Sequence, residues 1–373
     1  MTRLIAAFLL AALPSFPATA AHRTPGAAPE ITATSINASA PSGKNDSDPS
    51  LIAKAEVLLD RDHFSPGEID GMNGDNYRRA VRAFQQANNL PATGILDADT
   101  WNALISNALE PVLNPYTITD ADLAGPFDKQ IPVDLAQMAE FRGLSYRSPL
   151  AELAEKFHMN MEFLRKLNPR ADFEHPGQQV VVANVKALNL RAGRDTFEAI
   201  PPNNNEGAAN ESVATILVDK PARNVRAYDK EGRLLAFYPA TIGSEEKPAP
   251  SGAFKVRGVE WNPDFVYDPK FAWKGVSVRQ KLTIRPGPNN PVGLVWIALT
   301  APSYGIHGTP EPTNIGKTES HGCIRLTNWD AVDLAAMVRR GTVVKFEDED
   351  SPVSPMPGPV SERRGLETKR GQP

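Results

Sequence analysis

The sequence predicts a multidomain α+β protein in which a small three-helix domain comes first, a short βααβ module follows, and a mostly β domain forms the C-terminal part. Three observations carry this prediction. A chain of 373 residues is longer than one ordinary domain. Apolar residues recur at helical spacing in the first half and gather in strand-like runs after residue 213. Segments rich in proline and small polar residues separate these regions, as linkers do.

Residues 1–20 have the pattern of an export signal peptide. Arg3 precedes an apolar run from Leu4 to Leu13, and Ala18-Thr19-Ala20 fits the small-x-small pattern of a cleavage site. The apolar run is too short to cross a bilayer as a helix, which disfavours an uncleaved anchor. We therefore expect a periplasmic or otherwise extracytoplasmic protein that has no integral membrane anchor after the signal is removed.

Three further segments are expected to remain without a fold because their composition is polar or proline-rich and shows no periodicity. They are a flexible tether at 21–50, a linker at 193–212 and a disordered tail at 348–373. The formal net charge of the chain is only −4, which argues against a nucleic-acid partner held by a large basic surface.

The first compact segment, 51–108, is expected to form three short helices. Tyr77, Ala80, Val81 and Phe84 stand at i, i+3, i+4 and i+7, and glycines mark the loops. The segment resembles the peptidoglycan-binding domain family through a set of short motifs: Ile69-Asp70-Gly71, Ala80-Val81, Phe84-Gln85, Leu90, Thr93-Gly94 and Asp99-Thr100. This resemblance implies peptidoglycan as a partner, whereas the alternative is a generic helical spacer.

The second compact segment, 144–185, is expected to follow the order strand, helix, helix, strand. Its first helix carries an apolar stripe from Leu150 to Phe157, and a strand-like run begins at Gln179. This order resembles a LysM module, a family that binds glycan chains. Arg147-Ser148-Pro149 stands where that family usually has Gly-Asp-Thr. A plain folded connector is therefore the alternative.

The third segment, 213–347, is expected to be mostly β with a late helix. Turn signals separate the expected strands, and Asn328 is expected to cap a helix that Gly341 closes. The expected strands are 214–219, 224–228, 233–241, 252–259 and 294–299. This segment has 18 basic and 13 acidic residues, a net charge of +5, while 51–185 has a net charge of −7. The difference is either ordinary surface variation or a sign that the β domain handles an anionic substrate.

Cys323 is the only cysteine of the chain, and a lone thiol in an exported protein needs a chemical reason to be present. His321 and His307 are both candidate bases that could take its proton and leave a nucleophilic thiolate. The amides around Gly322 could line an oxyanion hole. Arg325 follows two residues later, so in an extended strand its side chain returns to the same face and could hold a carboxylate. A buried structural cysteine and a metal site are the alternatives, and two histidines without a zinc motif disfavour the latter.

These residues resemble the signature of the L,D-transpeptidase catalytic domain, known as the YkuD family, across 213–347. The matching elements are His307-Gly308, Ser320-His321-Gly322-Cys323, Arg325 and the upstream Pro250, Gly252 and Phe254. Ala249 departs from the pattern, because a threonine usually precedes the proline. The resemblance implies that Cys323, His321, Gly322 and His307 are catalytic and that Arg325, Ser320 and Gly308 support substrate binding.

The resemblance further implies a reaction on peptidoglycan that needs neither metal nor cofactor. Cys323 would attack the third residue of a tetrapeptide stem, release D-alanine, and pass the acyl group to an amine acceptor. With water as the acceptor, the enzyme would be an L,D-carboxypeptidase. A non-catalytic wall-binding protein is the alternative from another class. Carbapenem-type inhibitors are expected to bind, and the identity of the acceptor and the oligomeric state stay open.

The stretch 261–290 is rich in aromatic and basic residues and lies between two expected strands. Two interpretations stay open for it. It is either an ordinary satellite hydrophobic cluster or a lid over the catalytic cleft.

Overall fold

The computed structural model describes residues 31–42, 47–106, 108, 110–193, 196–201, 213–271, 276, 278–320 and 322–348. The expected signal peptide at 1–20 lies outside these residues, as does nearly all of the expected tail. In the part of the chain that the structure describes, none of the helices combines the length and the apolar composition needed to cross a membrane.

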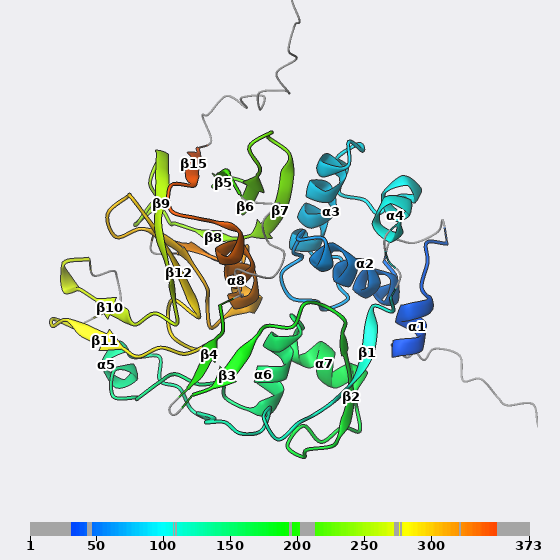
Figure 1. The fold of residues 1–373 in the computed structure, drawn as a ribbon, viewed down its shortest axis with the longest axis horizontal. Helices are drawn as coiled ribbons and strands as arrows, with labels where there is room; N and C mark the ends of the chain where they lie inside the picture. The colour runs from blue at the N-terminus through cyan, green and yellow to red at the C-terminus, as the bar shows by residue number, and fades with distance from the viewer. Residues whose placement is uncertain are drawn as a thin grey trace, which may run out of the picture. The chain divides into compact units, whose positions relative to one another are not determined.

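The expected three-helix domain is present (Figure 1). Its helices are α2 (Pro49–Arg61), α3 (Asp75–Ala87) and α4 (Ala98–Ile105). Asp48 and Asp97 cap α2 and α4 by accepting hydrogen bonds from backbone amides, which satisfies donors that a helix start leaves free. Phe64 packs edge-on against Phe84 of α3 with 5.5 Å between ring centroids, and both rings belong to the core of this domain.

A buried glutamine ties this domain together. The Gln85 amide donates to Thr93 Oγ1, to the Ile95 carbonyl and to Thr100 Oγ1, and its carbonyl oxygen accepts from the Gly94 amide. Gly94 has φ +76°, and a Cβ there would lie 2.9 Å from the Arg78 carbonyl oxygen. The Phe84-Gln85, Thr93-Gly94 and Asp99-Thr100 motifs thus stabilise the fold of the domain.

The expected tether differs from what the structure shows in its described part. Helix α1 (Ala33–Ala38) lies within it and buries Ile36 completely. The Asn37 side chain accepts hydrogen bonds from the amides of Val112 and Leu113 and donates to the Leu113 carbonyl. A single buried isoleucine and a satisfied asparagine therefore hold α1 against α2 and the strand that begins at Leu113.

The middle module has the two expected helices and the expected last strand, but its first strand lies earlier in the chain and an extra short helix, α5 (Leu135–Met138), follows that strand. β1 (Leu113–Thr117) pairs antiparallel with β2 (Gln179–Ala183), and α5, α6 (Pro149–Lys156) and α7 (Met161–Leu167) lie between them. Residues 144–148 form no strand. Pro115 hides β1 from a sequence-based prediction, because proline is tolerated only in strands with an unpaired side. The likeness to a LysM module stays a prediction.

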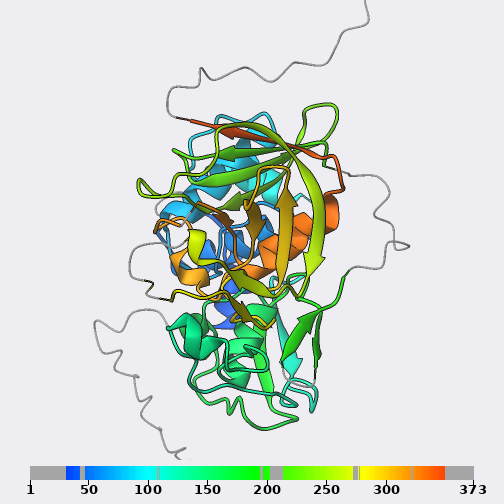
Figure 2. The ribbon, with the colours of Figure 1, turned by 90° about the vertical axis from the view of Figure 1, so that its left-hand side faces the viewer.

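The C-terminal part is built on a nine-stranded mixed sheet in the order β7-β6-β5-β15-β9-β12-β13-β14-β8. Figure 2 shows the long β9 in yellow-green and the helix α8 in orange. All five expected strands are present. The strands are β5 (Thr215–Asp219), β6 (Asn224–Tyr228), β7 (Leu234–Pro239), β8 (Thr241–Ile242), β9 (Gly252–Trp261), β12 (Val295–Leu299), β13 (Gly305–His307), β14 (Ile324–Arg325) and β15 (Val343–Glu347).

Helix α8 (Asn328–Met337) is the expected late helix, but both of its caps differ from the prediction. Thr327 is the N-cap, because its hydroxyl accepts a hydrogen bond from the Asp330 amide at 3.1 Å. Asn328 is the first helical residue and uses its side chain for long-range contacts. The helix ends at Met337 with Val338 as its C-cap, whereas Gly341, at φ +96°, belongs to the turn before β15.

Two hairpins flank the sheet. β3 (Leu190–Ala192) pairs with β4 (Phe197–Ala199), so the described start of the expected linker is folded. β10 (Phe265–Tyr267) pairs with β11 (Leu282–Ile284) in the aromatic-rich stretch. Tyr267 and Ile284 form a small buried cluster with Leu135 and Leu144 of the middle module. The described part of 261–290 therefore contributes to a satellite core, which favours that interpretation over a lid.

The helical domain and the middle module both contact α8 through buried polar groups. Ser65 Oγ donates to Asp330 Oδ2 at 3.0 Å, and the His158 ring stacks on Trp329 with 5.3 Å between centroids. The Asn328 amide donates to Glu155 Oε1 at 2.9 Å. The N-terminal end of α8 is therefore the place where the three parts meet.

Candidate active site

Cys323 directly precedes β14, the short strand that lies between β13 and β8. Its side chain is partly exposed, and the thiol donates to the Ser303 carbonyl with an Sγ–O distance of 3.9 Å. A cysteine at the start of a strand is held by the backbone ladder of its neighbours. The sheet therefore fixes the position of the thiol and leaves it accessible.

The loop before Cys323 is shaped by two small residues. Ser320 is buried, and its hydroxyl donates to the Cys323 carbonyl at 2.6 Å, while its amide donates to the Gly243 carbonyl. Gly322 has φ +107°, a conformation that side chains rarely adopt. A Cβ at this position would also lie 3.1 Å from the Tyr304 ring. Ser320 thus organises the loop from inside, and its expected support of substrate binding stays a prediction.

His307 is buried at the end of β13. Its Nδ1–H donates to the Gly308 carbonyl at 2.7 Å, and its ring stacks on Trp296 with 5.2 Å between centroids. Burial, together with the nearby Arg325 charge, lowers the pKa of His307 to about 3. His307 is therefore neutral at ordinary pH and a weak base. His321 itself lies outside the described residues.

Arg325 lies beside His307 in the parallel register of β13 and β14, so both side chains leave the sheet on the same face. Its charge interacts with Cys323, two residues earlier, and with Glu311. Burial lowers the pKa of Arg325, and both of these neighbours raise it. The expected placement of a guanidinium on the side of the nucleophile agrees with this geometry.

The thiol of Cys323 is not activated by its described surroundings alone. Burial raises the pKa of Cys323, whereas a hydrogen bond from the Gly305 amide and the positive charge of Arg325 lower it. Burial has the larger effect, so without a base the group stays a thiol at neutral pH. A nucleophilic role for Cys323 therefore requires a base, as expected for a cysteine-histidine pair.

Gly308 has a packing role in the structure. A Cβ at this residue would lie 2.1 Å from Asn328 Oδ1, the oxygen that accepts a hydrogen bond from the Leu294 amide. Gly308 therefore allows β13 to approach the start of α8 closely. This packing gives a structural reason for the glycine after His307, and its expected support of substrate binding stays a prediction.

Four residues around the site were not predicted from the sequence. Ser303 and Gly305 contact the thiol through the backbone, and Tyr304 lies against Gly322. Trp296 covers His307, and it also lies where a Cβ of Gly305 would be, at 2.5 Å. A contact made through the backbone does not require a particular residue type, so it cannot be predicted from the sequence. Only Gly305 could have been noticed, because a glycine within a strand can mark a close approach of another group. Among the described residues, no group of three or more histidine, cysteine or carboxylate side chains is placed to bind a metal ion.

Residues 214–346 match the family described as the L,D-transpeptidase catalytic domain, and residues 50–104 match the putative peptidoglycan binding domain. The putative L,D-transpeptidase YkuD of Bacillus licheniformis is 30% identical over 47% of this chain and 89% of its own length. The chain belongs to the L,D-transpeptidase family. The family and enzyme class expected from the cysteine-histidine motif are thus confirmed.

Other L,D-transpeptidases are similar over part of their length. The probable L,D-transpeptidase YbiS of Escherichia coli K12 is 27% identical over 54% of this chain and 60% of its own. A solved L,D-transpeptidase from Mycobacterium smegmatis is 19% identical over 48% of this chain and 77% of its own, with a TM-score of 0.30.

Proposed function

We propose that this chain is an exported L,D-transpeptidase that cross-links peptidoglycan stem peptides through a thioester on Cys323. The observation that carries the proposal is the alignment of β13 with β14, which sets Arg325 on the face of Cys323 and beside His307. Family membership supports the reaction class, and the match at 50–104 supports attachment to the wall polymer.

The first half of the proposed reaction forms the acyl-enzyme. His321 takes the Cys323 proton, and the thiolate attacks the carbonyl carbon of the third stem residue. The tetrahedral oxyanion is stabilised by backbone amides near the thiol. When it collapses, the bond to the terminal D-alanine breaks, and the leaving amine takes the proton from the His321 imidazolium. Arg325 holds a donor carboxylate by charge-assisted hydrogen bonds.

The second half transfers the acyl group. The amine of an acceptor stem, or of a wall-linked protein, attacks the thioester carbonyl, and the thiolate of Cys323 leaves. His321 receives the acceptor's proton and is ready for the next cycle after the thiol reforms. Water in place of the amine gives hydrolysis, which is the L,D-carboxypeptidase alternative. Carbapenem-type inhibitors would acylate the same sulfur.

The deciding experiment is incubation of the purified chain with tetrapeptide-stem fragments, followed by mass analysis of the products. Cross-linked products that have lost D-alanine support the proposal. Tripeptide alone would establish the carboxypeptidase alternative. Unchanged substrate, together with sedimentation of the protein with insoluble wall material, would favour a non-catalytic wall-binding protein.

A further inference from the structure

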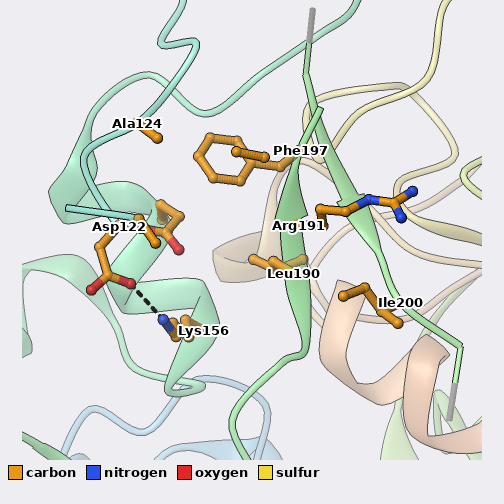
Figure 3. Close-up of a pocket in the computed structure, with 10 residues that line it drawn as sticks. Asp122, Ala124, Lys156, Leu190, Arg191, Phe197 and Ile200 are labelled. Carbon is orange, nitrogen blue, oxygen red and sulfur yellow. Dashed lines mark hydrogen bonds and ion pairs between the residues drawn. The ribbon is translucent and has the colours of Figure 1, made fainter. Parts of the chain in front are cut away.

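A cavity of about 310 Å³ lies between the middle module and the β3–β4 hairpin, and Cys323 does not line it. Figure 3 shows Asp122 and Lys156 on one side and Leu190 and Phe197, from the hairpin, on the other. This volume is at the lower end of ligand pockets, about 300–1,000 Å³, and suits a single small ring. The comparisons and the proposed reaction assign nothing to it.

The charged groups of the cavity are already paired with one another. Lys156 Nζ donates to Asp122 Oδ1 at 2.5 Å, and Asp122 also accepts from the hydroxyl of Tyr116 at 2.7 Å. Arg191 forms an ion pair with Glu198, and Figure 3 shows its guanidinium extending away from Asp122 and Lys156. An ionic ligand would therefore gain no unpaired countercharge here, and a neutral ligand is favoured.

Glu152 is the exception among these polar groups. Its side chain lines the cavity and is only 2% exposed, and within the described residues its Oε2 atom has no hydrogen-bond partner. Burial raises the pKa of Glu152 to about 8, while the Lys156 charge lowers it and Asp122 and Glu155 raise it. The acid is thus neutral at pH 7 and can both donate and accept a hydrogen bond.

We propose that this cavity binds one neutral sugar unit of the cell-wall glycan. A sugar ring offers an apolar face to Phe197 and Leu190, and its hydroxyls can bond the unpaired oxygen of Glu152. A buried polar atom without a partner is costly, so a ligand that satisfies it gains affinity. The choice of glycan rests on the proposed wall attachment, whereas the site rests on the cavity alone.

The first test blocks the cavity. Ala124 is exposed at its rim, and Ala253 is exposed on β9 far along the chain, so Ala124→Trp and Ala253→Trp form a matched pair. The probe is a soluble β-1,4-linked N-acetylglucosamine tetramer, titrated calorimetrically into the full chain. We expect one binding site in the native protein and in Ala253→Trp, and at least tenfold weaker binding in Ala124→Trp. Absent binding, or equal binding to both variants, overturns the proposal.

The second test isolates Glu152. At pH 9 its acid form is a minor fraction, so saccharide binding to the native chain should weaken by about tenfold relative to pH 7. Glu152→Gln keeps the shape and a donor but cannot ionise, so its affinity should be the same at both pH values. A pH dependence that persists in Glu152→Gln, or cavity binding of free tetrapeptide in place of saccharide, contradicts the assignment. Neither test measures transpeptidation, so the outcomes of both tests are independent of the proposed reaction.

Discussion

Around Cys323, the decisive residues act through charge and through backbone geometry. Arg325 and the Gly305 amide favour the thiolate, while burial opposes it. Ser320 and Gly322 hold the loop that presents the sulfur. The site is therefore a partly exposed thiol on a rigid support whose reactivity depends on a base.

Replacing Cys323, the proposed nucleophile, should separate chemistry from folding. We expect Cys323→Ala to abolish carbapenem acylation and stem-peptide turnover, because the one thiol of the chain is removed. The melting temperature should stay close to that of the native protein, since the described contacts of the thiol are weak hydrogen bonds to the backbone of Ser303 and Gly305. Intact-protein mass spectrometry checks the adduct and calorimetry the fold. Turnover by Cys323→Ala would disprove the thioester route.

Arg325 is expected to bind a carboxylate of the donor stem peptide. Arg325→Lys keeps the charge but loses the planar pair of donors, so transition-state binding should weaken by about 1.5–3 kcal/mol. The measurement is kcat/KM on a carboxylate donor and on its amidated analogue. A selective loss on the carboxylate donor is expected. Equal losses on both substrates, with a lower melting temperature, would assign Arg325 to local structure, such as its interaction with Glu311.

At the scale of single elements, the residue that follows β13 lies very close to the start of α8. A Cβ at Gly308 would overlap Asn328 Oδ1, which caps the amide of Leu294. Asn328 also donates to Glu155 of α6, so this one side chain joins the catalytic sheet to the middle module. A substitution at the end of β13 that moves Asn328 should therefore disturb both the catalytic sheet and the middle module.

Gly308→Ala should destabilise the protein by about 1–3 kcal/mol, because overpacking must displace Asn328 or the strand. Gly258→Ala on β9 is the matched control, since nothing lies within 4 Å of its Cβ position. Denaturant unfolding measures both. If the two variants have the same free energy of unfolding, the close approach of β13 and α8 does not constrain position 308.

The sequence predicted the elements with strong periodicity and missed those that depend on tertiary contacts. Strands β5, β6, β7, β9 and β12 and helices α2, α3 and α4 follow from their own apolar patterns. Helix α1 has one buried side chain, Ile36, and β1 contains Pro115, so neither carries a local signal. The motif identified Cys323 and Arg325, whereas Ser303 and Tyr304 reach the site through the fold alone.

At the scale of the whole molecule, ion pairs and hydrogen bonds join the helical domain to the catalytic sheet. Asp333 of α8 accepts from His63 Nδ1 at 2.8 Å and from the Tyr238 hydroxyl at 2.7 Å. The hydrogen bond to Asp333 raises the pKa of His63. Desolvation raises the pKa of the half-buried Asp333, but the hydrogen bond from His63, with other favourable interactions, lowers it overall. The pair is therefore ionised on both sides in mildly acidic solution.

This pair predicts a pH-dependent contribution to stability. The raised pKa of His63 gives stabilisation that is full below its unfolded pKa, about 6.5, and is lost as pH rises through the folded value. His63 is partly exposed, so the effect should be about 1 kcal/mol or less. Urea unfolding between pH 6 and pH 9 should show this loss in the native protein and not in His63→Gln. Parallel pH profiles for the two proteins would contradict it.

The backbone bridge between the helical domain and β7 has a consequence for solubility. β7 is an edge strand of the nine-stranded sheet, and such edges recruit strands of other molecules. The Phe237 amide donates to the His63 carbonyl, and its own carbonyl accepts from the Ser65 amide, both at 2.9 Å. The helical domain thus occupies hydrogen-bonding groups that would otherwise template aggregation. Because it precedes the sheet in the chain, it is made first and can cover this edge as soon as β7 forms.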